Sequence, residues 1–306
     1  MNILHAVVLG ALQGFAEVLP ISSSAHLILV PWLLKWPESG LTFDVALHLG
    51  TFIALALYFR QDIVEMAAAF FETLSTRSLG TPAKRLPFLI IAATVPAAVV
   101  GKLFEHQMED IFRSNPLFIA LALIIFGIIL GIADIAGRKR LALDEIKPAS
   151  AMTIGLFQCL ALIPGVSRSG ITITAGLMLG FTRESAARFS FLLSLPIVAG
   201  AALLKCLHLA RHGIPAGEGV PMLVGILVSA ITGYISVAFL LRFVQKHSIS
   251  PFVWYRVVAG GVVIAAIMSR VFGNAISAAF RVLLRKRLAD SRNICTARVT
   301  KLVELL

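Results

Sequence analysis

Two short stretches of sequence decide the fold: Pro20-Ile21-Ser22-Ser23-Ser24 and Pro164-Gly165-Val166-Ser167-Arg168-Ser169-Gly170. Each interrupts an apolar region, the first within residues 3–34 and the second within residues 150–180. The arms on either side are about 10–16 residues long, shorter than the roughly 20 residues that a spanning helix needs. Irregular backbone is tolerated at membrane depth only where protein or a cavity surrounds it. We therefore predict two re-entrant helix-loop-helix hairpins.

The composition places the chain in a membrane. Of its 306 residues, 58% are hydrophobic and 14% are charged, and the mean hydropathy is +0.91. A soluble domain carries about 25% charged residues. The first apolar run has no basic segment before it and contains Gln13, Glu17 and Pro20, so we interpret it as part of the working protein and not as a signal peptide. The three cysteines lie far apart and predict neither a disulfide framework nor a metal cluster.

Six further stretches are long and apolar enough to cross a bilayer. They cover residues 42–59, 86–104, 116–134, 186–207, 220–241 and 251–271. Three of them follow each hairpin, and the two breaks resemble each other. We therefore predict an all-α integral membrane protein with six spanning helices and two re-entrant hairpins in an inverted repeat, 1–134 and 150–271, followed by a basic tail, 272–306. Broken helices of inverted repeats tend to meet near the midplane.

The net charge of +11 has a membrane explanation. Lys and Arg collect in cytoplasmic loops and near anionic lipid, so we do not expect nucleic-acid binding. The loop charges predict a cytoplasmic side that includes residues 60–85 and 138–147, which leaves the N-terminus outside. The basic residues of the tail fall on the predicted outer side. Either the tail lies along the lipid surface or one span is miscounted.

Glu17 and Arg168 fall at predicted membrane depth, where an unpaired charge costs about 2.5–3.5 kcal/mol or more. They either form a buried ion pair that holds the hairpins together or face a polar cavity. The neighbouring hydroxyls favour the cavity.

The second arms of the hairpins begin with good N-cap sequences, Ser22-Ser23-Ser24 and Ser169-Gly170. A helix N-terminus presents free N–H groups and a partial positive charge to an anion. Gly165 and Gly170 allow close approach of the backbone, and the Arg168 guanidinium matches phosphate oxygens. We therefore predict a phosphate site.

Four residues could act on that phosphate. His26 follows Ser23 by three residues, so on a helix the two share a face, as a base and a nucleophile would; an ordinary hydrogen-bonded histidine is the alternative. Gln13 and Glu17 are four residues apart and could hold a divalent cation that bridges the phosphates, or simply bond to each other.

Other polar residues point less clearly to chemistry. We interpret His48 as a core residue whose polar groups are satisfied. Trp254, Tyr255 and Arg256 are typical of an interfacial anchor, although Arg256 could reach inward.

Two motifs resemble a known family. Gln13-Gly14-Phe15-Ala16-Glu17, followed by Leu19-Pro20-Ile21-Ser22-Ser23-Ser24-Ala25-His26, is similar to the (E/Q)xxxE and PxSS(T/S)xH segments of the undecaprenyl-pyrophosphate phosphatases associated with bacitracin resistance. The stretch from Pro164 to Thr172 is similar to that family's PGxSRSxxT motif. The chain departs in having Gln13 where Glu is frequent, in Ser24-Ala25, and in its basic tail.

The resemblance implies an enzyme of the bacterial inner membrane. It would hydrolyse undecaprenyl pyrophosphate to undecaprenyl phosphate and phosphate, assisted by Mg²⁺ or Ca²⁺, at a site open to the periplasm, and so recycle the cell-wall lipid carrier. Its expected partners are this polyprenyl lipid, membrane lipids and a second copy in a homodimer. The implied roles are as follows: Ser23, His26 and Glu17 catalytic, Gln13 and Glu17 metal-binding, and Ser22, Ser167, Arg168, Ser169, Gly170 and Thr172 phosphate-binding.

Two questions stay open. The attacking group is either Ser23 or a water activated by His26. A polyprenyl-phosphate flippase or secondary transporter would also have inverted repeats and a midplane anion site, but it would need no nucleophile with a base. A structural scaffold would not need a buried Arg168.

Overall fold

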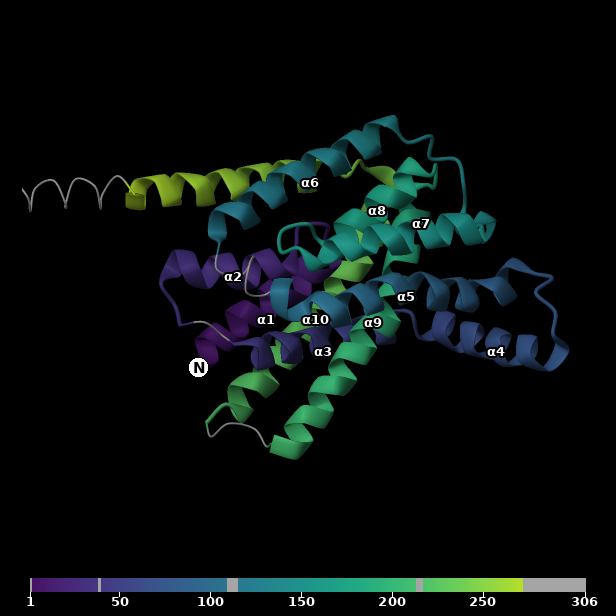
Figure 1. Cartoon of the computed structure of the whole chain (residues 1–306), viewed down its shortest axis with the longest axis horizontal. Helices are drawn as coiled ribbons and strands as arrows, with labels where there is room; N and C mark the ends of the chain where they lie inside the picture. The colour runs from purple at the N-terminus through teal and green to yellow at the C-terminus, as the bar shows by residue number, and fades with distance from the viewer. Residues whose placement is uncertain (1, 38–39, 109–114, 213–216, 272–306) are drawn as a thin grey trace, which may run out of the picture. The chain divides into compact units, whose positions relative to one another are not determined.

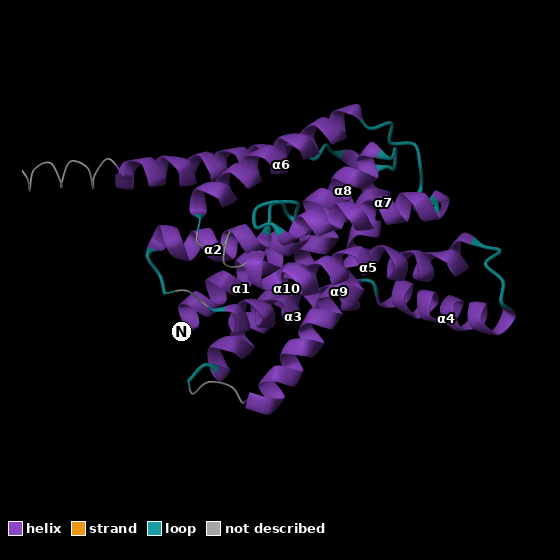
Figure 2. Ribbon diagram, viewed as in Figure 1, coloured by secondary structure: helices purple, strands orange, loops and turns teal. Residues whose placement is uncertain are grey.

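The computed structural model describes residues 2–37, 40–108, 115–212 and 217–271. Throughout these ranges the regular structure is helical, apart from an isolated bridge between Leu141 and Phe181 (Figure 2). The all-α prediction is therefore confirmed, while the tail, 272–306, lies outside the described residues. The chain divides into two units, Met1–Val263 and Ile264–Leu306. The site described below belongs to the first unit.

Both predicted breaks lie between short helices (Figure 1). The first lies between α1 (Ile3–Val18) and α2 (Ser23–Leu34). The second lies between α7 (Pro148–Gln158), which continues into the 3₁₀ helix η3 (Cys159–Leu162), and α8 (Arg168–Met178). None of these helices has the length of a span.

Five helices in the described part of the chain are long and apolar enough to cross a membrane. They are α5 (Pro82–Met108), α6 (Pro116–Ala136), α9 (Arg183–His212), α10 (Gly219–Lys246) and the helix Ser250–Val271. A short 3₁₀ helix, η2 (Leu143–Glu145), lies between α6 and α7. These helices make the chain a multi-pass membrane protein.

The region of the remaining predicted span is bent. α3 (Leu41–Tyr58) is followed at once by α4 (Arg60–Thr76), and the two helices differ in direction by 76°. The sequence predicted a loop after residue 59, so α4 is an addition to that prediction. Two contacts of Arg188 hold the bend: its guanidinium bonds to Asp62 and lies 5.8 Å from the ring centroid of buried Phe59.

The first arm of each hairpin packs against a helix from the other half of the chain (Figure 1): α1 lies against α10, and α7 lies against α5. Glycines allow close approach of the backbones. A Cβ on Gly10 would lie 2.7 Å from the Gly225 oxygen, and one on Gly155 would lie 2.3 Å from the Ala93 oxygen. Small residues serve helix packing in membranes in this way. The packing brings the two loop tips to the same region of the first unit.

Candidate active site

The two loops end in serines with the same unusual backbone conformation. Ser22 has φ 76° and Ser167 has φ 74°. Each serine caps the helix that follows: Ser22 Oγ accepts from Ala25 N at 3.4 Å, and Ser167 Oγ accepts from Gly170 N at 3.1 Å. The second cap was predicted at Ser169-Gly170, but α8 already begins at Arg168. Strained backbone of this kind clusters at functional sites.

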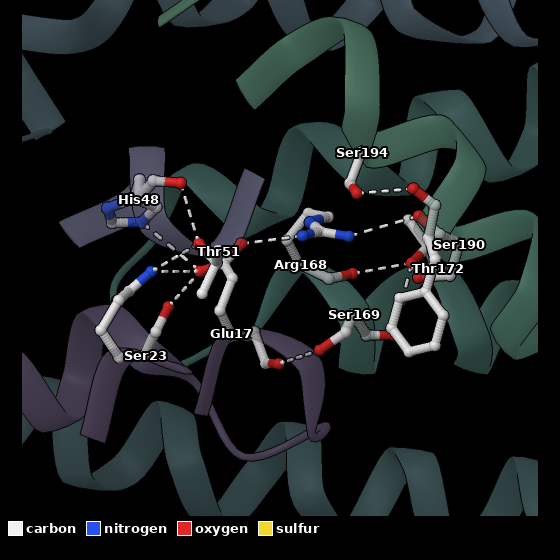
Figure 3. A network of polar contacts seen from close by, with 12 residues as sticks. Glu17, Ser23, His48, Thr51, Arg168, Ser169, Thr172, Ser190 and Ser194 are labelled. Atoms are coloured by element: carbon white, nitrogen blue, oxygen red, sulfur yellow. Dashed lines mark hydrogen bonds and ion pairs between the residues drawn. The ribbon is translucent and has the colours of Figure 1, made fainter. Parts of the chain in front are cut away.

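Glu17 lies at the centre of the site (Figure 3). Its Oε2 accepts from Ser23 Oγ at 2.5 Å and from Gln13 Nε2 at 3.3 Å, and lies 3.4 Å from His48 Nε2. Its Oε1 accepts from Arg168 Nη2 at 2.7 Å. The carboxylate is 8% exposed. Because water is largely excluded there, these bonds are stronger than they would be at a surface.

Arg168 is braced from α9. Its Nη1 donates to the Ser190 carbonyl oxygen at 3.2 Å. Thr172 Oγ1 bonds to Arg168 O at 2.8 Å and to Ser190 Oγ at 2.7 Å (Figure 3). Ser169 Oγ donates to Leu19 O at 3.1 Å. The hydroxyls of Ser169 and Thr172 therefore bond to protein groups, and they position Arg168 and the first loop.

A cavity of about 280 Å³ adjoins the Glu17–Arg168 pair. Helices from both halves of the chain line it. Its polar lining residues are Glu17, Ser22, Ser23, Ser24, His48, Gln158, Ser167 and Arg168. Its apolar lining residues are Ala16, Val45, Ala97, Ala161, Leu162, Ile197, Val198 and Ala201. Glu17 and Arg168 thus form an ion pair and also face a cavity, the two alternatives that the sequence left open.

His26 has partners other than Ser23. Its Nδ1 is 2.7 Å from Ser22 O, and its Nε2 is 2.6 Å from Tyr255 Oη. Its ring stacks on that of Tyr255, with the centroids 5.6 Å apart. The neutral ring satisfies both contacts if Nδ1 donates and Nε2 accepts. The structure therefore brings Ser23 to Glu17, and it places His26 where it supports the Ser22 backbone.

His48 is a functional candidate that the sequence interpretation left in the core. Its Nδ1 is 2.8 Å from the Asp44 carbonyl oxygen, and its Nε2 faces Glu17. Both neighbours are acceptors, an arrangement that a doubly protonated ring satisfies. The signal was present in the sequence, because His48 is a polar, titratable residue within an apolar helix.

Arg256 is fully buried, so it is not an interfacial anchor, and the alternative that it reaches inward is confirmed. Its guanidinium donates to four carbonyl oxygens: Pro20 at 3.2 Å, Gly165 at 2.8 Å, Val166 at 3.0 Å and Leu123 at 3.0 Å. It joins both loops because loop carbonyls without helical partners need donors.

The two residues that precede Arg256 in sequence are exposed, whereas Gly170 packs closely against its guanidinium. Trp254 and Tyr255 are 68% and 44% exposed, as expected of residues near lipid. A Cβ on Gly170 would lie 2.9 Å from Arg256 Nη1. The glycine was expected to make room for a ligand, and in the structure it makes room for this guanidinium.

A divalent cation would find few protein ligands here. The described part of the chain has no group of three or more His, Cys, Asp and Glu side chains that could hold a metal. Glu17 supplies a carboxylate, and Gln13 Oε1 is buried with no hydrogen-bond partner among the described residues. Mg²⁺ needs only one or two protein carboxylates when water and substrate phosphates complete its shell. The residues fit a cation that is bound together with a phosphorylated substrate.

Helical spans, paired broken helices and a buried carboxylate–arginine site define a multi-pass membrane protein with a polar centre inside its helices. A family model described as bacitracin resistance protein BacA matches residues 6–262, and the chain belongs to this family.

Curated relatives extend the match over most of the chain. A protein of Pelobacter propionicus, described as an undecaprenyl-diphosphatase, is 70% identical over 273 residues, covering 89% of this chain and 100% of the relative. Relatives with the same description from Geobacter metallireducens and Moorella thermoacetica are 63% and 48% identical, each covering 88% of this chain and 100% of their own length.

Proposed function

We propose that this chain is an undecaprenyl-diphosphatase, which hydrolyses undecaprenyl pyrophosphate to undecaprenyl phosphate and phosphate and so recycles the cell-wall lipid carrier. One observation carries the proposal: Ser23 donates to Glu17 at 2.5 Å in a cavity that Arg168 and apolar side chains also line. A nucleophile with a base, an anion-binding cation and apolar walls suit a lipid diphosphate. The descriptions of the relatives support the same activity.

The geometry favours Ser23 as the nucleophile. As Ser23 Oγ forms a bond to the terminal phosphorus, its proton passes to Glu17 Oε2. The bond from that phosphorus to the bridging oxygen breaks, and undecaprenyl phosphate leaves with the electron pair. Water then hydrolyses the phosphoserine, which releases phosphate and restores the Ser23 hydroxyl. Arg168 and the N-termini of α2 and α8 stabilise the charge on the phosphoryl oxygens.

His26 has a supporting role in this proposal. It holds the Ser22 carbonyl and thereby the strained turn from which Ser23 projects. The alternative is a water activated by His26, and it requires the ring to leave Tyr255 or Ser22. A search for phosphoserine at Ser23 by mass spectrometry after rapid quenching separates the two routes.

A Mg²⁺ or Ca²⁺ ion is part of the proposal. Glu17 and Gln13 Oε1 would hold it together with the substrate phosphates, and the cation would neutralise phosphate charge. The cation is not needed to activate the Ser23 hydroxyl, because its proton passes to Glu17.

We also propose the membrane arrangement. α3 is the sixth span, and the two hairpins are re-entrant within an inverted repeat, 1–134 and 150–271. The N-terminus is outside and the cavity opens to the periplasm of the inner membrane, in keeping with the loop charges. A homodimer belongs to the same proposal, and light scattering of the detergent complex tests it.

The test of function uses purified, detergent-solubilised protein and C55 pyrophosphate. We expect phosphate release that stops in EDTA and in Ser23→Ala. Failure of wild-type protein to release phosphate, with excess cation present, would overturn the proposal. A flippase would transport the lipid without cleaving it, and a pure carrier has no use for the Ser23–Glu17 pair.

A further inference from the structure

Gln158 is a buried amide without hydrogen-bond partners. It is the last residue of α7, and its side chain is 2% exposed. Neither Oε1 nor Nε2 bonds to any of the described residues. The side chain lines the same cavity as Glu17, Ser23 and Arg168. None of the roles assigned above uses this residue.

The first hairpin explains why Gln158 is unpaired. Gln13 and Gln158 each lie nine residues before the loop serine of positive φ, Ser22 or Ser167. Gln13 has an acceptor one helical turn later, because Glu17 follows it by four residues and accepts from its Nε2. Four residues after Gln158 the chain has Leu162, so the second hairpin offers no such partner.

An unpaired buried amide is unfavourable. Its donor and acceptor bond to no protein group among the described residues, which costs free energy in a buried amide, and native structures keep few such groups without a functional reason. A leucine or methionine of similar size would avoid this cost. The partners of Gln158 are therefore expected to enter the cavity from outside the protein.

The charges of the cavity favour a neutral donor. Arg168 already bonds to Glu17 and to the Ser190 carbonyl, so its charge is shared with a carboxylate before substrate arrives. A diphosphate brings several acceptor oxygens and needs donors beyond this guanidinium. An amide supplies two N–H groups, and its oxygen can accept from a water or a protonated phosphate.

We infer that Gln158 is a substrate-binding residue whose amide Nε2 donates to a non-bridging oxygen of the diphosphate group. This inference rests on the proposed function. It adds a substrate contact from the second hairpin, whereas Ser23 and Glu17 belong to the first. The amide bonds when substrate is present and is unsatisfied when it is absent.

The experiment replaces Gln158 by methionine, which keeps the length and removes both polar groups. We expect KM for C55 pyrophosphate to rise about tenfold to a hundredfold, the range for losing a hydrogen bond to a charged group. The thermal unfolding midpoint of ligand-free protein should stay equal to that of wild type or rise. A non-hydrolysable methylene analogue of the substrate should raise the thermal unfolding midpoint less in Gln158→Met than in wild type. Gln61→Met, at an exposed position on α4, is the matched control and should change none of these values.

Two results would overturn the inference. Unchanged KM and an unchanged analogue effect would show that Gln158 does not touch the diphosphate. A ligand-free Gln158→Met that unfolds well below wild type would show that the amide is a structural group satisfied by water. If wild-type protein releases no phosphate, the proposed function fails, and the analogue effect alone still decides whether Gln158 binds a diphosphate.

Discussion

Arg168 Nη2 donates to Glu17 Oε1 at 2.7 Å, which joins two residues 151 positions apart, one from each hairpin. The same carboxylate accepts from the Ser23 hydroxyl through its other oxygen. A single group therefore links the anion-binding arginine to the nucleophile, and a change at any one of the three alters the other two.

Replacing Glu17 by glutamine tests that linkage. We expect phosphate release to fall by about a hundredfold or more, because the proton acceptor of Ser23 is lost. The thermal unfolding midpoint should also fall, since removal of one partner leaves a buried guanidinium unpaired. Glu65→Gln, an exposed position on α4, is the control. Activity within a fewfold of wild type would exclude Glu17 as the base.

Arg168→Lys keeps the positive charge and loses the two separate N–H donors of the guanidinium. The two guanidinium nitrogens donate in different directions, to Glu17 and to the Ser190 carbonyl, and a single ammonium does not reproduce both bonds. We expect activity to drop by about tenfold or more, with a folded protein by circular dichroism. Nearly full phosphate release from the lysine variant would contradict the phosphate-gripping role.

Gln13→Glu places a second carboxylate beside Glu17. The two negative charges repel each other at low cation concentration, and a divalent cation relieves that repulsion. The variant should therefore keep near-normal activity in excess cation, with its Mg²⁺ or Ca²⁺ midpoint moved to lower concentration than that of wild type. A midpoint identical to that of wild type would remove Gln13 from the cation site.

Arg256→Met removes the donors of four carbonyl bonds. We expect the free energy of unfolding to fall by about 3 kcal/mol or more, because buried loop carbonyls are left unpaired. Activity should fall with it, as the loops that carry Ser23 and Arg168 lose their common donor. Arg140→Met, at an exposed position, is the comparison. If Arg256→Met is as stable as wild type, the two loops keep their conformation without the hydrogen bonds from Arg256.

Cysteine labelling tests the orientation. In a background without Cys159, Cys206 and Cys295, Ser24→Cys should react with a membrane-impermeant thiol reagent added to spheroplasts. Arg140→Cys should react only after lysis. The reverse pattern would overturn the periplasmic opening, and labelling of Ser24→Cys from both sides would favour alternating access.

The breaks and their chemistry were predictable because proline, serine and charge stand out within apolar sequence. Glu17, Ser23 and Arg168 were singled out on that ground, and the structure brings them together. The partner of Ser23 was less predictable. Helical spacing favoured His26, but the chain turns at Ser22 with positive φ, and this turn brings Glu17 to the hydroxyl instead.

Long-range contacts were beyond the sequence argument. Arg256 lies beside Trp254 and Tyr255, whose composition is typical of an interface, and only the packing of its helix against α6 and the loops shows that its side chain turns inward. The bend after Tyr58 escaped prediction for a similar reason, because Arg188, far along the chain, holds it.

The packing of α1 against α10 has a consequence for synthesis. α1 ends at Val18 and α10 begins at Gly219, so the ribosome makes most of the chain before the surface that receives α1 exists. The nascent hairpin also carries Glu17 well before translation reaches Arg168, and an unpaired charge resists entry to the bilayer interior. The hairpin of α1 and α2 should therefore be among the last parts of the chain to settle, and a chain truncated before α10 should leave this hairpin accessible to protease.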